Sequence, residues 1–164
     1  MNIHPIFVHF PIALFTFYAI FEIFRLPVLT RQTWFFYVKA VLVIAGSAMS
    51  FITIITGKMS EKFMEGHPAL EYHEFFAFTT AGIFLAIALS YLFAWIGRER
   101  QVESGFWQIW VGCGEKIVES RWIIALAILG FVCVTITGGI GGAMVFGSEA
   151  DPLFKPVYEF LIMK

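Results

Sequence analysis

Charged residues are scarce in this chain, and their scarcity is the first guide to its class. Of 164 residues, 14% are Asp, Glu, Lys or Arg, 59% are hydrophobic, and the mean hydropathy is +0.81. Soluble domains hold about 25% charged residues. The composition therefore predicts an integral membrane protein of the all-α class, and the length suits one domain, residues 1–164, with about four spans. The net charge of −1 gives no basic surface for nucleic acid.

Cysteine and early basic residues are also nearly absent. The two cysteines, Cys113 and Cys133, form neither a CxxC pair nor a CxxCH motif, which excludes the signature of covalent haem attachment. No Lys or Arg precedes Arg25, and no small-residue cleavage site follows the apolar run before it. We therefore expect the first apolar run to be a membrane span and not a signal peptide.

Four apolar runs are long enough to cross a bilayer, and they predict an integral membrane four-helix bundle. The expected spans are residues 3–24, 34–56, 73–96 and 122–146. The aromatic segment 106–111 is too short to span and is typical of an interfacial segment. The apolar patch 157–163 is expected at the interface or against a partner. Glu22 is expected to form a snorkelling ion pair with Arg25 or Lys39 at the interface.

Basic residues predict the orientation of the bundle. The side of the membrane that holds the connections after spans one and three carries seven of them: Arg25, Arg31, Lys39, Arg98, Arg100, Lys116 and Arg121. The opposite side carries four: Lys58, Lys62, Lys155 and Lys164. By the positive-inside rule both termini then face outward, which is the periplasmic side of a bacterial inner membrane.

The histidines are the candidate functional residues, because all four fall at the predicted outer end. They are His4, His9, His67 and His73. His4 and His9 are about 7.5 Å and about 140° apart on a regular helix, so they cannot both face one small ligand. Two imidazoles from different helices could ligate a haem iron axially. Three or four could bind zinc or copper with Glu71 or Glu74, and single histidines could carry protons or bind a quinone headgroup. A purely structural role at helix ends is the remaining alternative.

A glycine cluster lies in the second half of the fourth predicted span, at the same end as the histidines. Its members are Gly138, Gly139, Gly141 and Gly142. Glycines would let a flat haem approach the helix backbone closely. Alternatively, the Gly138–Gly142 pair has the GxxxG spacing of simple helix packing.

Several motifs resemble those of a known family, DUF2231, which consists of bacterial four-span membrane proteins. Residues 4–14, HPIFVHFPIAL, resemble the opening motif of that family. The chain is also similar in the pair Thr56-Gly57 at the end of span two, in His73 at the start of span three, and in the stretch 141–147, GGAMVFG. It departs from the family at Phe146, where tyrosine is usual, and it has no histidine in span four. The resemblance covers residues 3–147.

The resemblance implies a b-type cytochrome-like protein that holds haem b without covalent attachment. Some members are joined to Rieske or cytochrome c modules, which implies electron transfer at the outer face. We expect one or two haems, with His9 and His73 as the first axial pair and His4 and His67 as a possible second pair. The protein would be an electron-transfer subunit rather than a stand-alone enzyme.

The expected partners are other membrane redox subunits or a periplasmic electron carrier, together with the lipid bilayer. A quinone is a further candidate ligand. The alternative is a non-catalytic accessory subunit of a membrane complex, whose histidines hold another pigment, a metal or nothing.

Overall fold

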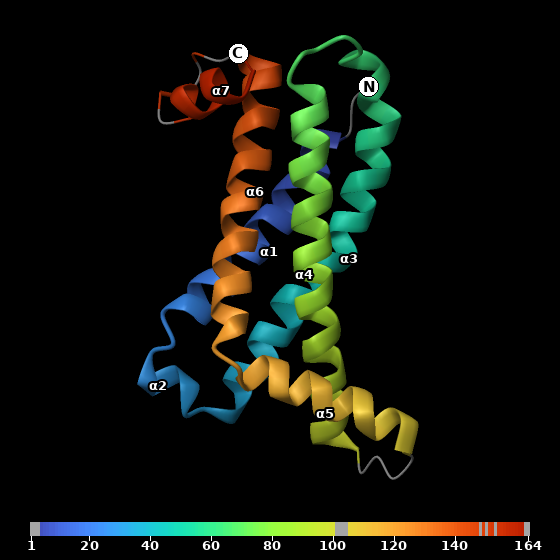
Figure 1. Ribbon diagram of the computed structural model, residues 1–164, viewed down its shortest axis with the longest axis vertical. Coiled ribbons are helices and arrows are strands. Elements are labelled where there is room, and N and C mark those ends of the chain that lie inside the picture. Colours follow the sequence, from blue (N-terminus) through green and yellow to red (C-terminus); the bar gives the residue numbers. More distant parts are fainter. Residues whose placement is uncertain (1–3, 101–104, 148, 150, 153, 163–164) are drawn as a thin grey trace.

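Four long helices form the body of the protein (Figure 1). The computed structural model describes residues 4–100, 105–147, 149, 151–152 and 154–162. The long helices are α1 (His4–Ile23), α3 (Thr33–Ser60), α4 (Leu70–Glu99) and α6 (Trp122–Phe146), and each is long and apolar enough to cross a membrane. The all-α, four-span prediction is thereby confirmed.

Short helices connect or flank the long ones. They are α2 (Pro27–Thr30), the 3-10 turn η1 (Glu61–Phe63), α5 (Gly105–Glu119) and α7 (Lys155–Ile162). Helix α5 contains the aromatic segment predicted to be interfacial, and it lies across the end of α4 that is remote from the termini (Figure 1). Gly114 permits this crossing, because a Cβ there would lie 2.7 Å from the Ser90 carbonyl oxygen. Helix α7 includes residues 157–162 of the predicted apolar patch in the tail. Residue 163 of that patch lies outside the described residues.

Two predicted span ends differ from the structure. The second span was expected to end at Gly57, but α3 continues through it to Ser60, and the third helix begins at Leu70, before the expected start at His73. Gly57 is a packing position rather than a helix end, because its missing side chain leaves room for the ring of His4. The earlier start of α4 places His73 in the first turn of that helix.

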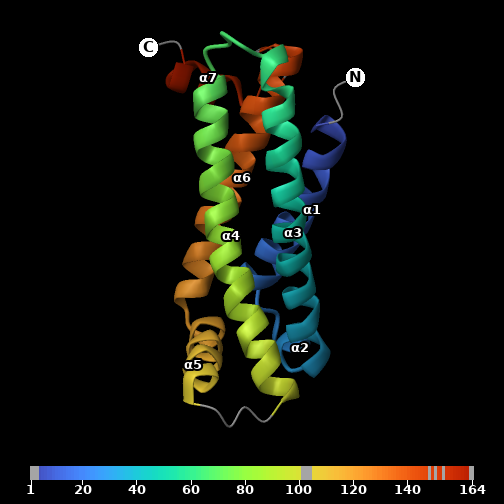
Figure 2. The same cartoon turned by 90° about the vertical axis from the view of Figure 1, so that its right-hand side faces the viewer.

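The long helices pack in the ring order α1, α3, α4, α6, so that α1 and α4 lie on one diagonal. The N-terminal end of α1, the connection between α3 and α4, and α7 all lie at the same end of the bundle in both views (Figures 1 and 2). All four histidines are at this end, which we call the terminal end. Which side of the membrane it faces stays a prediction.

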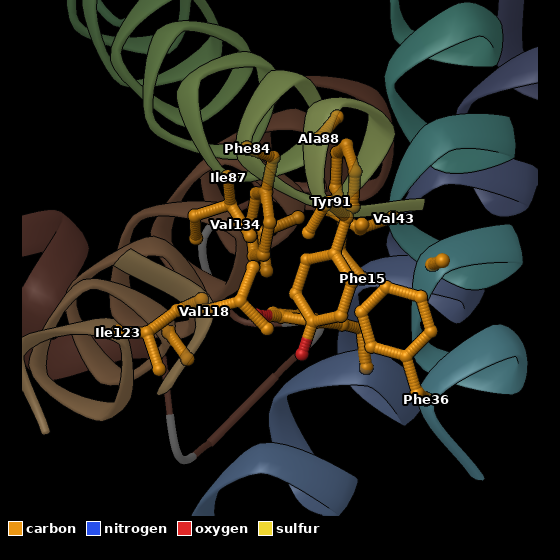
Figure 3. Close-up of a cluster of buried hydrophobic side chains, with 14 residues drawn as sticks. Phe15, Phe36, Val43, Phe84, Ile87, Ala88, Tyr91, Val118, Ile123 and Val134 are labelled. Atoms are coloured by element: carbon orange, nitrogen blue, oxygen red, sulfur yellow. The ribbon is translucent and has the colours of Figure 1, made fainter. Parts of the chain in front are cut away.

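Aromatic rings fill the centre of the bundle (Figure 3). The rings of Phe15 on α1 and Phe84 on α4 stack with centroids 3.9 Å apart. Gly46 on α3 makes this possible, because a Cβ there would lie 2.6 Å from the Phe15 ring. Further from the terminal end, Tyr18 and Tyr91 meet edge to face at 5.7 Å. The diagonal helices α1 and α4 are thus held together by rings.

Pro11 lies inside α1 and has a specific compensation. Proline has no N–H, so the carbonyl of Phe7, four residues earlier, loses its helical donor. The hydroxyl of Thr53 on α3 lies 3.2 Å from that carbonyl and 3.0 Å from the Met49 carbonyl of its own helix, so its single proton is shared between the two acceptors. A neighbouring span therefore completes the hydrogen bonding of α1.

Candidate functional site

His73 is held in a defined orientation between α4 and α6. Its Nδ1 lies 3.1 Å from the carbonyl oxygen of Thr137, and a carbonyl can only accept, so Nδ1 carries the proton. The neutral ring then has its lone pair on Nε2. The same ring lies against Gly141, where a Cβ would be 3.1 Å from its Cε1 atom.

His4 is held in a similar way between α1 and α3. Its Nδ1 lies 3.3 Å from the hydroxyl oxygen of Thr56. That hydroxyl donates to the Thr53 carbonyl at 3.0 Å, so it accepts from His4. Nδ1 of His4 is therefore also a donor, and the ring lies against Gly57, where a Cβ would be 3.1 Å from its Cε1 atom.

The structure brings His4 and His73 together across the diagonal of the bundle. The two imidazoles lie close enough to interact electrostatically. Each span contributes to the site: α1 and α4 supply one imidazole each, and α3 and α6 supply one glycine and one acceptor each. Metal-ligating histidines nearly always donate their second ring nitrogen to a protein acceptor in this manner. The arrangement is therefore suited to holding an electron-pair acceptor between two imidazoles.

The other two histidines do not join this site in the structure. His9 is exposed on the outside of α1, and its Nδ1 donates to the Pro5 carbonyl of its own helix at 2.7 Å. This follows from the offset of about 140° from His4. His67 accepts the backbone N–H of Ala69, the residue before α4, at 3.2 Å. The structure thus places His4, and not His9, near His73, and the predicted axial pair of His9 and His73 stays a prediction.

The four glycines of α6 have four different surroundings. Gly141 contacts His73, whereas a Cβ at Gly142 would meet nothing within 4 Å. Gly139 seats the ring of Phe154, which precedes α7, and Gly138 faces Ile12 at an ordinary 3.6 Å. One of the four is thus placed at the histidine pair.

An ion pair borders the site at the terminal end. Lys58, next to Gly57, contacts Glu74, next to His73, at 2.6 Å, and it also contacts Glu61 at 3.2 Å. In the described part of the chain, no group of three or more His, Cys, Asp or Glu side chains is placed to hold a metal ion. The described polar groups of the site thus include the two imidazoles, their acceptors and the bordering ion pairs.

The prediction of a snorkelling Glu22 is wrong. Its partners are Arg25 and Lys39 as expected, but the side chain is fully buried and also accepts a hydrogen bond from Tyr91 on α4. This contact could not be predicted from the sequence, because Tyr91 lies 69 residues further along the chain than Glu22. Glu22 therefore belongs to the core and not to the lipid interface.

The chain matches a known protein family. The family described as "Predicted membrane protein (DUF2231)" matches residues 1–150, which include the whole histidine site. No curated protein and no solved structure matches the chain significantly.

Proposed function

We propose that this chain, which belongs to the DUF2231 family of predicted membrane proteins, is a b-type cytochrome-like subunit with haem b between His4 and His73. It would pass electrons at the terminal end of the bundle. The observation that carries the proposal is the pair of imidazoles near each other at the terminal end, each with Nδ1 donating to a protein acceptor. This tautomer presents Nε2 as the ligand atom, and bis-imidazole ligation suits electron transfer.

The chemistry of the residues around the pair supports the proposal of a haem. Gly57 and Gly141 carry no side chain beside the two rings, so the rings lie against the backbones of α3 and α6. The acceptors Thr56 and Thr137 hold the ring planes and favour the ligating tautomer. The bound haem would supply one-electron chemistry. The chain would supply two ligands, their orientation and an apolar surrounding.

The partners of the proposal follow from its position. We infer that the terminal end faces the periplasm, where a separate electron carrier or another membrane redox subunit would exchange electrons with it. A quinone could be the membrane-soluble donor. A non-catalytic accessory role is the competing function, and the same experiment separates the two.

The test is haem binding by single histidine variants. The purified protein should show a Soret band, and pyridine haemochrome should give one haem per chain. His4→Ala and His73→Ala should each lose most of it, because one axial ligand is removed. His9→Ala is the matched control, since it removes an exposed imidazole from the same helix as His4.

His67→Ala is a second control, and it should keep normal haem content. A colourless, well-folded protein would favour the accessory role. Retention of haem by both His4→Ala and His73→Ala would contradict the proposed ligands.

A further inference from the structure

We propose that Glu22 is a positioning residue for the histidine site: its buried carboxylate sets the axial register of α1 against α3 and α4, and so holds His4 opposite His73. The inference deepens the proposed function, on which its haem readout rests. Its register readout needs no haem.

Glu22 joins three helices through its two carboxylate oxygens. Oε2 accepts from Lys39 Nζ on α3 at 2.6 Å and from the Tyr91 hydroxyl on α4 at 3.1 Å. Oε1 accepts from the guanidinium of Arg25, with 2.9 Å to Nε. The Glu22 side chain is 0% exposed. Its partners on α3 and α4 thus fix where α1 lies along the bundle axis.

The same spacing separates this cluster from the histidine site on all three helices. On α1 the pair is His4 and Glu22, on α3 Gly57 and Lys39, and on α4 His73 and Tyr91; each pair is 18 residues apart. Eighteen residues are five full turns, or about 27 Å, so both members of a pair lie on one face of their helix. A shift at one end is therefore transmitted to the other as a rigid translation.

The aromatic layer between the two sites follows the same register. Phe15 and Phe84 stack, and they are 69 residues apart, as are His4 and His73, and Glu22 and Tyr91. Three layers of α1 thus meet α4 with one constant offset. Pro11, which interrupts the hydrogen bonding of α1, lies between the layers, but its effect is compensated by Thr53.

Apolar packing alone would define this register weakly. Lipid tails are as apolar as the side chains, so two apolar helix faces can slide along each other with little loss of free energy. Hydrogen bonds between helices, in contrast, form at only one axial position of the two helices. A slip of one turn, about 5.4 Å, would take Oε2 out of reach of Lys39 and Tyr91 together. It would leave the Lys39 ammonium group without its carboxylate partner and the Glu22 carboxylate with Arg25 as its one remaining partner from the cluster. The cluster therefore selects the register in which His4 and His73 lie at the same level of the bundle.

The test measures register and haem separately. Spin labels at Ile6→Cys and Phe75→Cys, both on exposed positions of α1 and α4, report the distance between these helices at the terminal end. Cys113→Ser and Cys133→Ala remove the native thiols. Glu22→Ala should broaden or shift the distance by several ångströms, lower haem occupancy at least fivefold and weaken the low-spin signal of two axial imidazoles.

Matched variants separate positioning from general damage. Glu99→Ala is the control, because Glu99 also accepts a hydrogen bond from another span, from Tyr37 at 2.7 Å, but in an exposed position. This variant should leave both the spin-label distance and the haem occupancy unchanged. Exchanging the charges, Glu22→Lys with Lys39→Glu, should restore the register in part. If Glu22→Ala does not fold, Tyr91→Phe, which removes one hydroxyl, should give a smaller shift of the same kind.

The outcomes are distinguishable. An unchanged distance in folded Glu22→Ala and Tyr91→Phe would overturn the inference, whether or not haem is lost. A shifted distance in a protein that never binds haem would retain the register role and reject the proposed function instead.

Discussion

The neighbouring glycines Gly141 and Gly142 allow a sharp test of how α6 supports the histidine site. Both lie in the same turn of the helix, so substitution by alanine changes helix propensity equally, by about 1 kcal/mol, and that change cancels in the comparison. Only Gly141 contacts His73. The difference between the two alanine variants therefore isolates the contact with the imidazole.

The expected magnitude follows from the contact distances. A Cβ at Gly141 would lie 3.1 Å from Cε1 and 3.4 Å from Nδ1 of His73, so the ring must retreat by a few tenths of an ångström. Its hydrogen bond to Thr137 is already 3.1 Å long, and further lengthening would weaken it. Losing such a bond costs about 1 kcal/mol, or about fivefold in haem affinity. A hydrogen bond that orients a metal-ligating histidine typically changes the affinity about tenfold or more.

The assay is titration of the apoprotein with haem, followed by the Soret band. Gly141→Ala should weaken haem binding about five- to tenfold, and Gly141→Leu should abolish it. Gly142→Ala should bind like the unchanged protein, because a Cβ there meets nothing within 4 Å. Thermal unfolding of each apoprotein controls for folding. Equal affinities of the two alanine variants would refute the reasoning, since the contact with His73 would then have no consequence.

Two further predictions concern topology and the proline in α1. A reporter fused after Lys164 should be active on the periplasmic side, because seven basic residues lie toward the opposite end of the bundle and four toward the terminal end. Activity of the reporter on the cytoplasmic side would contradict this orientation. Thr53→Val should lower the free energy of unfolding by about 1 kcal/mol, because it removes the donor to the Phe7 carbonyl. Thr79→Val is the control, since that hydroxyl bonds only within its own helix, at 2.8 Å to Phe75, and an equal loss there would contradict the role of Thr53.

The sequence was sufficient to predict the spans and the gathering of the histidines, for physical reasons. Long apolar runs must be helices in a bilayer, since backbone groups there have no water to bond. An even number of spans returns both termini to one end. The 140° offset also showed that His4 and His9 must face different surroundings, which the exposed position of His9 confirms.

The position of His4, rather than His9, near His73 could not be predicted, because it depends on the register between helices. The sequence placed His73 level with His9, since the start of the third span was assigned from hydropathy. In the structure α4 begins at Leu70, and the offset of 69 residues puts His73 beside His4. The spacing of 18 residues that three spans share, such as that between His4 and Glu22, contains information on the register. It can be recognised only when the contacts between the spans are known.

The contact between Thr53 and Phe7 has a consequence for how the protein enters the membrane. During synthesis α1 emerges before α3, and alone in the hydrocarbon it would expose the carbonyl that Pro11 leaves without a donor, at a cost of several kcal/mol. It would also carry the charge of Glu22 without Lys39. The stable unit for insertion is therefore the hairpin of α1 and α3, and α1 becomes a fully satisfied transmembrane helix only when its successor lies beside it.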